Sequence, residues 1–261
     1  MELWLLNHFS TALLALLVVG GFVVLAVTAS LVTTRRFPAL VGGENNDMVG
    51  VVLGMFGAIY GIILAFVIVN LWTELQDTQK IVSTEATAVS QIARDAKAFP
   101  PDVQTAVDAS VRGYVHGVVE LQWPLMRAGH GDFTVTASKM DAMYTALRAY
   151  EPQSQSEQAF YTEALSSLND AVGQRRDRIN ASREELPVLL QVLIVGGALV
   201  ILALTLLYGI RSLKVRMLFV GSVAALIGFS LLLVLVLDRP FAGELSVSPA
   251  PFKESALARF W

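Results

Sequence analysis

The chain has 261 residues, of which 54% are hydrophobic and 16% are charged, and its formal net charge is −3. A soluble domain averages about 25% charged residues, so this deficit is typical of an integral membrane protein. The slightly acidic balance offers no basic surface for nucleic acid, and the absence of cysteine excludes disulfides, thiolate metal sites and cysteine nucleophiles.

Four stretches without a charged side chain are long enough to cross a bilayer core, which takes about 20 apolar residues. They are Leu3–Thr34, Met48–Thr73, Leu186–Ile210 and Met217–Leu237. Small residues at Ala26–Ser30 fit a signal-peptide cleavage site. The first run is nevertheless longer than a typical signal sequence and has no leading positive charge, so a retained helix is predicted.

Apolar positions recur at spacings of three and four after the second stretch, as in a helix that packs along a seam. They are Trp72, Leu75, Gln79, Val82, Ala86, Val89, Ala93 and Ala96. The second membrane helix is therefore predicted to continue out of the bilayer as far as Phe99-Pro100-Pro101, because the residue before a proline avoids the helical region. We expect Asp102 to cap the helix that follows.

Three more helices are predicted in the polar block, over about 103–125, 135–150 and 161–186, with the last leading straight into the third membrane helix. Two long helices that frame two short ones favour a four-helix bundle. The predicted fold is all-α and polytopic, with four transmembrane helices and a helical-bundle insert between the second and third. It divides into a first transmembrane hairpin, an extramembrane bundle, a second hairpin and an interfacial tail, at 1–73, 74–185, 186–237 and 238–261.

The sequence carries no signature of an enzyme. His8, His116 and His130 stand apart from one another, without an acidic residue at metal-ligand spacing. There is no phosphate-binding glycine loop after a strand and no serine in a nucleophile elbow. We therefore predict no catalytic residue, no metal site and no cofactor.

The second membrane helix carries the residues of greatest functional interest. Small residues recur along it, a pattern that lets helices approach closely, either within one subunit or around the axis of an oligomer. Polar groups on the same helix continue below the bilayer, and at membrane depth such groups face protein or water. Asn70 lies near the interface, where water alone can satisfy it. The candidates for a pore or an interface are Gly54, Gly57, Tyr60, Gly61, Asn70, Glu74 and Glu85.

A cluster of arginines precedes the third membrane helix, at Arg175, Arg176, Arg178 and Arg183. Ion pairing with Glu74 and Glu85 on the antiparallel helix is one interpretation, and a basic ring that attracts anions is the other. The fourth helix ends at Asp238, Arg239 and Pro240. Because the helix dipole opposes a carboxylate at a helix C-terminus, we expect Asp238 to need a cation such as Arg178 or Arg183.

The segment after Pro240 is predicted to lie on the membrane surface and to tie the fourth helix to the bundle as a structural anchor. Its apolar residues are Phe252, Ala256, Leu257, Phe260 and Trp261. A plain helix stop followed by a disordered tail is the alternative interpretation.

Four segments resemble the bestrophin-like family, which is catalogued as a domain of unknown function. They are "GAIYGIILAFVIVNLW" with "EATAVSQIARD", "RINASREELPVLLQVLIVGG" and "LDRPFAGELSVSP". The resemblance covers about Val49 to Pro251, and its label implies similarity to bestrophins, which are pentameric anion channels. No bestrophin pore motif or calcium-binding motif is present.

These observations predict a homo-oligomeric channel or pore for small inorganic ions in the lipid bilayer of the cell membrane. A non-conducting sensor or scaffold, in which the bundle binds a partner or ligand, is the alternative. Cations in the short loops 35–47 and 211–216 favour a cytoplasmic location for those loops, which places both termini and the bundle outside. The bestrophin resemblance and the arginines at 175–183 favour the inverse orientation.

Overall fold

The computed structural model describes residues 2–261, which are almost entirely helical and contain no strand. The α-helices are α1 (Glu2–His8), α2 (Thr11–Arg36), α3 (Asn46–Asp95), α4 (Pro101–His116), α5 (Trp123–Arg127), α6 (Ala137–Arg148), α7 (Gln155–Ala181), α8 (Val188–Leu207) and α9 (Leu213–Leu237). A π-helical segment, Gly117–Gln122, joins α4 to α5. Short 3-10 turns occupy Pro38–Val41, Ala96–Ala98, Ala250–Lys253 and Ser255–Phe260.

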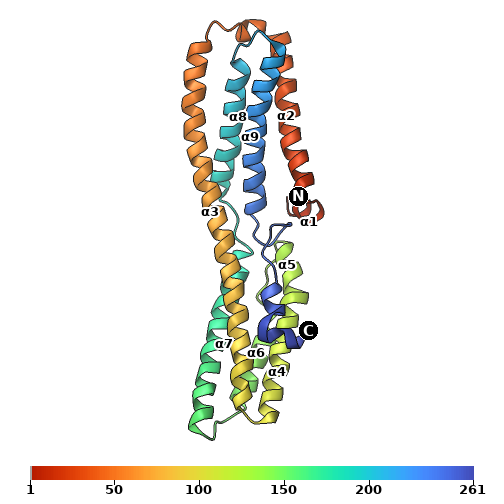
Figure 1. Ribbon diagram of the computed structural model, residues 1–261, viewed down its shortest axis with the longest axis vertical. Helices are drawn as coiled ribbons and strands as arrows, with labels where there is room; N and C mark the ends of the chain where they lie inside the picture. Colours follow the sequence, from red (N-terminus) through yellow and green to blue (C-terminus); the bar gives the residue numbers. More distant parts are fainter. Residues whose placement is uncertain (1) are drawn as a thin grey trace.

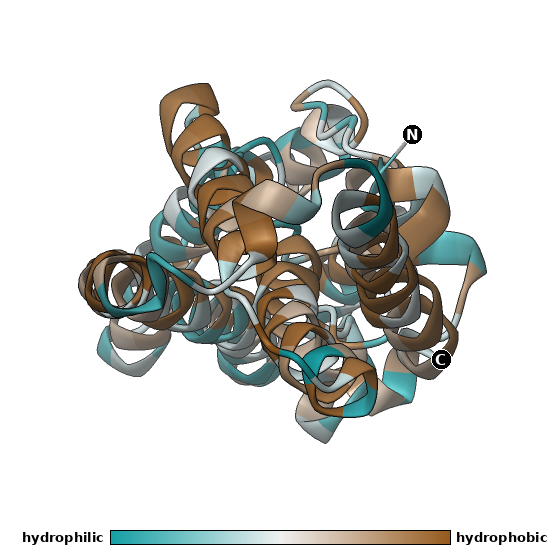
Figure 2. Cartoon of the chain, turned by 90° about the horizontal axis from the view of Figure 1, so that it is seen from above, coloured by the Kyte–Doolittle hydropathy of each residue, from teal (hydrophilic) through white to brown (hydrophobic). Residues whose placement is uncertain are grey.

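The molecule is elongated and has two halves (Figure 1). One half contains α2, the first part of α3, α8 and α9, the four helices that are long and apolar enough to cross a membrane. The other half contains the rest of α3 with α4 to α7. Seen from above, the membrane half presents mainly hydrophobic residues (Figure 2). The all-helical fold and four helices that could span a membrane are thus present as predicted.

Helix α3 connects the two halves without interruption. Its 50 residues extend about 75 Å at 1.5 Å per residue, far beyond the roughly 30 Å core of a bilayer. Six of the eight predicted seam positions are buried, among them Leu75 and every position from Val82 onward. Trp72 and Gln79 are exposed, whereas Leu71 and Thr78 are buried. At these two turns the buried residue is the one immediately before the predicted position, while Leu75, Val82, Val89 and Ala96 keep the seven-residue spacing of the seam.

The insert folds as a bundle around a core shared with α3. Buried Val107, Val111 and Tyr114 of α4 and Met143 of α6 face the seam of α3. Asp102 is not the N-cap of α4: Pro100 takes that position, and no side chain caps the helix. The prolines already fix the backbone there, so the first turn forms without a capping oxygen.

Two of the predicted helix connections differ in the structure. Helix α7 ends at Ala181, and residues 182–187 are not helical, so α7 does not continue into the membrane. Pro187 cannot donate a backbone hydrogen bond and disfavours a helical residue before it, which breaks the path. The first apolar stretch is also divided, because Ser10 caps α2 by accepting a hydrogen bond from the Leu13 amide at 3.3 Å.

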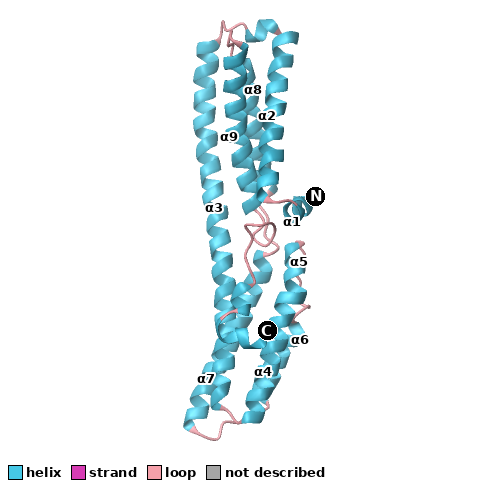
Figure 3. Ribbon diagram, turned by 45° about the vertical axis from the view of Figure 1, so that its right-hand side comes forward, coloured by secondary structure: helices cyan, strands magenta, loops and turns pink. Residues whose placement is uncertain are grey.

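The tail is ordered, and it packs on the bundle rather than on the membrane surface (Figures 1 and 3). Phe252, Leu257 and Phe260 are buried at 0%, 1% and 5% exposure. They join the same core cluster as Tyr114 and Trp123. The predicted interfacial position is therefore wrong for these side chains, since the bundle offers an apolar groove that removes them from water as completely as lipid headgroups would.

Candidate functional site

A buried ion pair lies at the centre of the bundle. The Arg178 Nε and Nη2 atoms of α7 donate to the two carboxylate oxygens of Glu85 on α3, at 2.6 and 3.0 Å, and both side chains are 0% exposed. The Tyr114 hydroxyl also donates to Glu85, and the Gln122 Oε1 atom accepts from Arg178 at 3.0 Å. Helices α3, α4 and α7 and the π-helical segment thus contribute to one polar network.

The charges of this network stabilise one another in a dry environment. Burial disfavours the charged form of Arg178, but the neighbouring Glu85 carboxylate outweighs burial and raises the pKa of Arg178. Burial and the same carboxylate raise the pKa of the Tyr114 hydroxyl well above its ordinary value, so Tyr114 remains a hydrogen-bond donor. Glu85 is therefore fully occupied inside the bundle and does not face a pore within this chain.

The other arginines of α7 and the following loop also serve the bundle. Arg175 donates to the Thr136 hydroxyl at 2.9 Å and to the Phe133 carbonyl, and Arg183 donates to the Gly131 carbonyl at 2.7 Å. Arg175 and Arg178 are buried, whereas Arg176 and Arg183 are exposed. The arrangement favours internal pairing over a basic ring.

The membrane-proximal face of α3 and α7 forms an acidic groove of about 470 Å³. Glu74 and Asp77 contribute from α3, and Asp177 and Glu184 contribute from the end of α7 and the loop after it. Asn70 lies at its membrane end, whereas Glu85 does not line it. No lysine, arginine or histidine lines the groove within the described residues. The arrangement concentrates negative potential where α3 leaves the membrane.

Within the membrane half, α3 packs on one side only. The Tyr60 hydroxyl donates to the Ile194 carbonyl of α8 at 2.8 Å, so Tyr60 anchors α3 to α8. Gly54, Gly57 and Gly61 lie beside that contact, and a Cβ atom built on any of them would meet no neighbouring atom within 4 Å. A groove of about 470 Å³ between α3 and α9 includes Gly57 and Gly61. The small-residue stripe is thus not used for packing within this chain.

Asp238 does not pair with Arg178 or Arg183, contrary to the expectation from the sequence. Its Oδ1 atom accepts the backbone N–H of Leu186 at 2.7 Å, and the side chain is 6% exposed. Arg178 binds Glu85 in the bundle core, and Arg183 donates to the Gly131 carbonyl. Arg239 forms a 2.8 Å ion pair with Glu185 instead, and Pro240 follows it outside the helix. Asp238 and Arg239 therefore fasten the end of α9 to the segment before α8.

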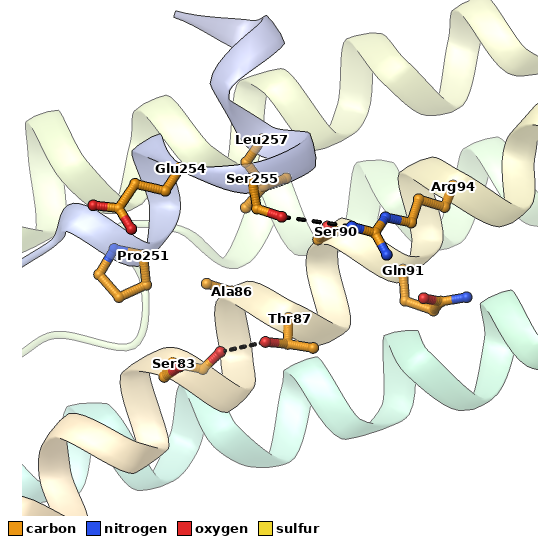
Figure 4. Close-up of a pocket in the computed structure, with 10 residues that line it drawn as sticks. All are labelled: Ser83, Ala86, Thr87, Ser90, Gln91, Arg94, Pro251, Glu254, Ser255 and Leu257. Atoms are coloured by element: carbon orange, nitrogen blue, oxygen red, sulfur yellow. Dashed lines mark hydrogen bonds between the residues drawn. The ribbon is translucent and has the colours of Figure 1, made fainter.

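A small polar cavity of about 220 Å³ lies between α3 and the tail (Figure 4). Ser83, Thr87, Ser90, Gln91 and Arg94 line it from α3, and Glu254 and Ser255 line it from the tail. Arg94 lies 3.5 Å from the Ser255 hydroxyl. Ser255 has a φ of 57°, the only positive φ of a non-glycine residue in the described chain. Such a conformation is costly and persists where surrounding contacts hold it.

The tail is also attached to α4 through His116, which gives a pH-dependent prediction. His116 Nε2 lies 2.9 Å from the Phe260 carbonyl, and Nδ1 lies 2.8 Å from Glu120. The hydrogen bond to the carbonyl, followed by Glu120, raises the pKa of His116 above 6.5. A raised histidine pKa gives stability that is complete below the unfolded pKa and is lost as pH rises through the folded pKa.

We therefore expect the melting temperature of the parent to exceed that of a His116→Gln variant at pH 6 by more than at pH 8.5. The effect should be small and weaken in high salt, because the ring is partly exposed. Thermal melts of both proteins across this pH range test it. A gap that does not narrow with rising pH would contradict a charged His116 contact.

Several residues of this region were not singled out by the sequence pattern. They are Tyr114, Gln122 and Glu185, which belong to no recognisable motif of the sequence. The sequence does contain a signal for the Glu85–Arg178 ion pair. Helices α3 and α7 are antiparallel, and the two residues lie at similar distances from the membrane. Opposite charges at matching heights on packed helices pair when both face the core.

Comparison with protein families gives one match. The bestrophin-like domain matches residues 20–252, which is most of the chain and includes α3, the bundle, α8, α9 and most of the tail. Searches of curated proteins and of solved structures found no significant match. Because the match covers most of its length, the chain belongs to the bestrophin-like family.

Proposed function

We propose that the protein is a homo-oligomeric ion pore of the cell membrane, in which the small-residue face of α3 packs against neighbouring subunits. The observation that carries this proposal is the unused face at Gly54, Gly57 and Gly61, where nothing lies within 4 Å of an added Cβ atom. Small residues at a membrane interface let helix backbones approach closely. Membership of the bestrophin-like family supports a channel-like role.

The acidic groove supports a preference for cations over anions in this pore. Glu74 and Asp77 follow Asn70 on α3 where the helix leaves the bilayer, and Asp177 and Glu184 face them. Rings of carboxylates attract cations and repel anions at the mouth of a channel. Repetition of the groove around an oligomer axis would produce such a ring from one acidic patch per subunit.

We propose that the short loops lie in the cytoplasm and that the bundle and both termini lie outside. Arg35, Arg36, Arg211 and Lys214 belong to the two short connections, which lie at the same end of the molecule (Figure 1). Asn46 joins them through two hydrogen bonds of 2.8 Å to the backbone of Gly209. Cations in short loops favour the cytoplasmic side.

Planar-bilayer recordings of the purified protein test conduction. We expect single-channel currents in potassium chloride, with a reversal potential in a salt gradient that indicates cation preference. Glu74→Gln should shift that reversal potential toward zero, because it removes one carboxylate from each subunit's groove. Glu163→Gln, an exposed α7 position outside the groove, is the matched control and should leave it unchanged. Verified insertion without current would contradict the pore.

A non-conducting sensor is the second candidate, and the cavity between α3 and the tail favours it. The cavity lies between α3, which crosses the membrane, and the tail, which follows the membrane helix α9. A ligand there would change how firmly the tail is attached to the bundle. Absence of current, together with a change in tail protection from proteolysis on ligand addition, would favour this function over the pore.

A further inference from the structure

The apolar cavity that ends at Asp238 has the composition of a binding site for an amphiphile. It has a volume of about 320 Å³, within the roughly 300–1,000 Å³ range of small-molecule sites. Phe22 of α2, Ile194 of α8 and Leu231 of α9 belong to its walls, which are otherwise almost entirely apolar. The Gln191 amide and the carboxylates of Glu2 and Asp238 are its polar groups.

The charge at this cavity is only partly balanced by the described residues, because Arg239 is the one cation near both carboxylates. Asp238 is 6% exposed, and its one hydrogen bond is the Leu186 amide on Oδ1. The adjacent cation, Arg239, is engaged by Glu185 at 2.8 Å. No lysine, arginine or histidine lines the cavity within the described chain. The buried Asp238 and the partly exposed Glu2 thus share a mostly apolar site, in which a carboxylate without a close cation is costly.

Burial raises the pKa of Asp238, and it also raises that of Glu2. The largest cause of both shifts is the loss of water around a carboxylate, and the nearby Arg239 opposes both without cancelling them. A cation placed between the two groups would oppose this effect and favour their charged forms. The apolar walls directly beside the carboxylates would at the same time remove an alkyl chain from water.

We propose that this cavity binds an amphiphile with an ammonium head and a single alkyl chain, the head contacting Asp238 and Glu2 and the chain lying among Phe22, Ile194 and Leu231. Charge complementarity selects the cationic head, and the apolar walls select the chain. The proposal does not depend on whether the protein conducts ions, because the cavity lies between α2, α8 and α9 and not on the α3 face.

The absence of cysteine from the chain makes the cavity directly measurable. A Leu231→Cys variant carries one thiol in the cavity wall, and its alkylation rate by N-ethylmaleimide reports occupancy. We expect dodecylamine to slow this alkylation at least tenfold in detergent-purified full-length protein. Dodecanol, with the same chain and no charge, and laurate, with the opposite charge, should protect far less. A Leu233→Cys variant places the thiol on α9 outside the cavity and should not be protected.

Two further variants separate the role of the charge from that of the walls. Asp238→Asn in the Leu231→Cys background keeps an oxygen acceptor for the Leu186 amide and should abolish the protection by dodecylamine. Glu2→Gln should weaken it, and Glu184→Gln, an acid outside the cavity, should preserve it. Equal protection by dodecanol, or full protection in both the Asp238→Asn and Glu2→Gln variants, would overturn the proposal.

Discussion

Replacing Arg178 with alanine is expected to lower the free energy of unfolding by about 3–5 kcal/mol, because it leaves the buried Glu85 carboxylate without its cation. Glu85 and Arg178 are each 0% exposed, so no water replaces the lost contact. The change also removes a hydrogen-bond partner from Gln122. Chemical unfolding of the purified protein, followed by circular dichroism, measures the effect.

Arg176→Ala is the matched control, since Arg176 lies two residues earlier on α7 and is exposed. It should change the unfolding free energy by less than about 0.5 kcal/mol. A double variant, Glu85→Gln with Arg178→Met, should lose less stability than Arg178→Ala alone, because it buries no unpaired charge. Equal losses for Arg176→Ala and Arg178→Ala would refute the buried network.

Gly197→Ala should destabilise the membrane half by about 1–3 kcal/mol, the usual cost of overpacking. A Cβ atom at Gly197 of α8 would lie 2.5 Å from the Tyr60 ring of α3. The ring cannot withdraw freely, because its hydroxyl donates to the Ile194 carbonyl at 2.8 Å. Thermal melts in detergent measure the loss.

The neighbouring Gly196→Ala is the control, because a Cβ atom there meets nothing within 4 Å. It should leave the melting temperature unchanged or raise it slightly, since alanine favours a helix over glycine. In a Tyr60→Leu background the cost of Gly197→Ala should largely disappear, which a double-mutant cycle measures as coupling. Additive effects would show that α3 and α8 do not meet at this point.

The membrane helices and the long α3 could be predicted from the sequence because their signals are local. A run of about 20 apolar residues has few alternatives to a spanning helix. No proline interrupts the chain between Pro38 and Pro100, so the sequence contains no proline that would end α3 at the membrane surface. The seam from Val82 onward follows from helical periodicity alone.

The partners of the charged residues could not be predicted, because they depend on how distant segments pack. The sequence places Asp238 at a helix end that needs compensation, but the Leu186 amide that supplies it belongs to a non-helical segment created by Pro187. The position of the tail could not be predicted for the same reason. Phe252, Leu257 and Phe260 are apolar enough for a membrane surface or a protein groove, and only the packed bundle decides between them.

The subunit arrangement in lipid nanodiscs, obtained by single-particle electron cryomicroscopy, tests the central claim most directly. The proposal predicts a closed ring of identical subunits in which Gly54, Gly57 and Gly61 of α3 contact the neighbouring subunit and the acidic grooves face the axis. A monomer, or a ring in which this face of α3 contacts only lipid, would contradict it.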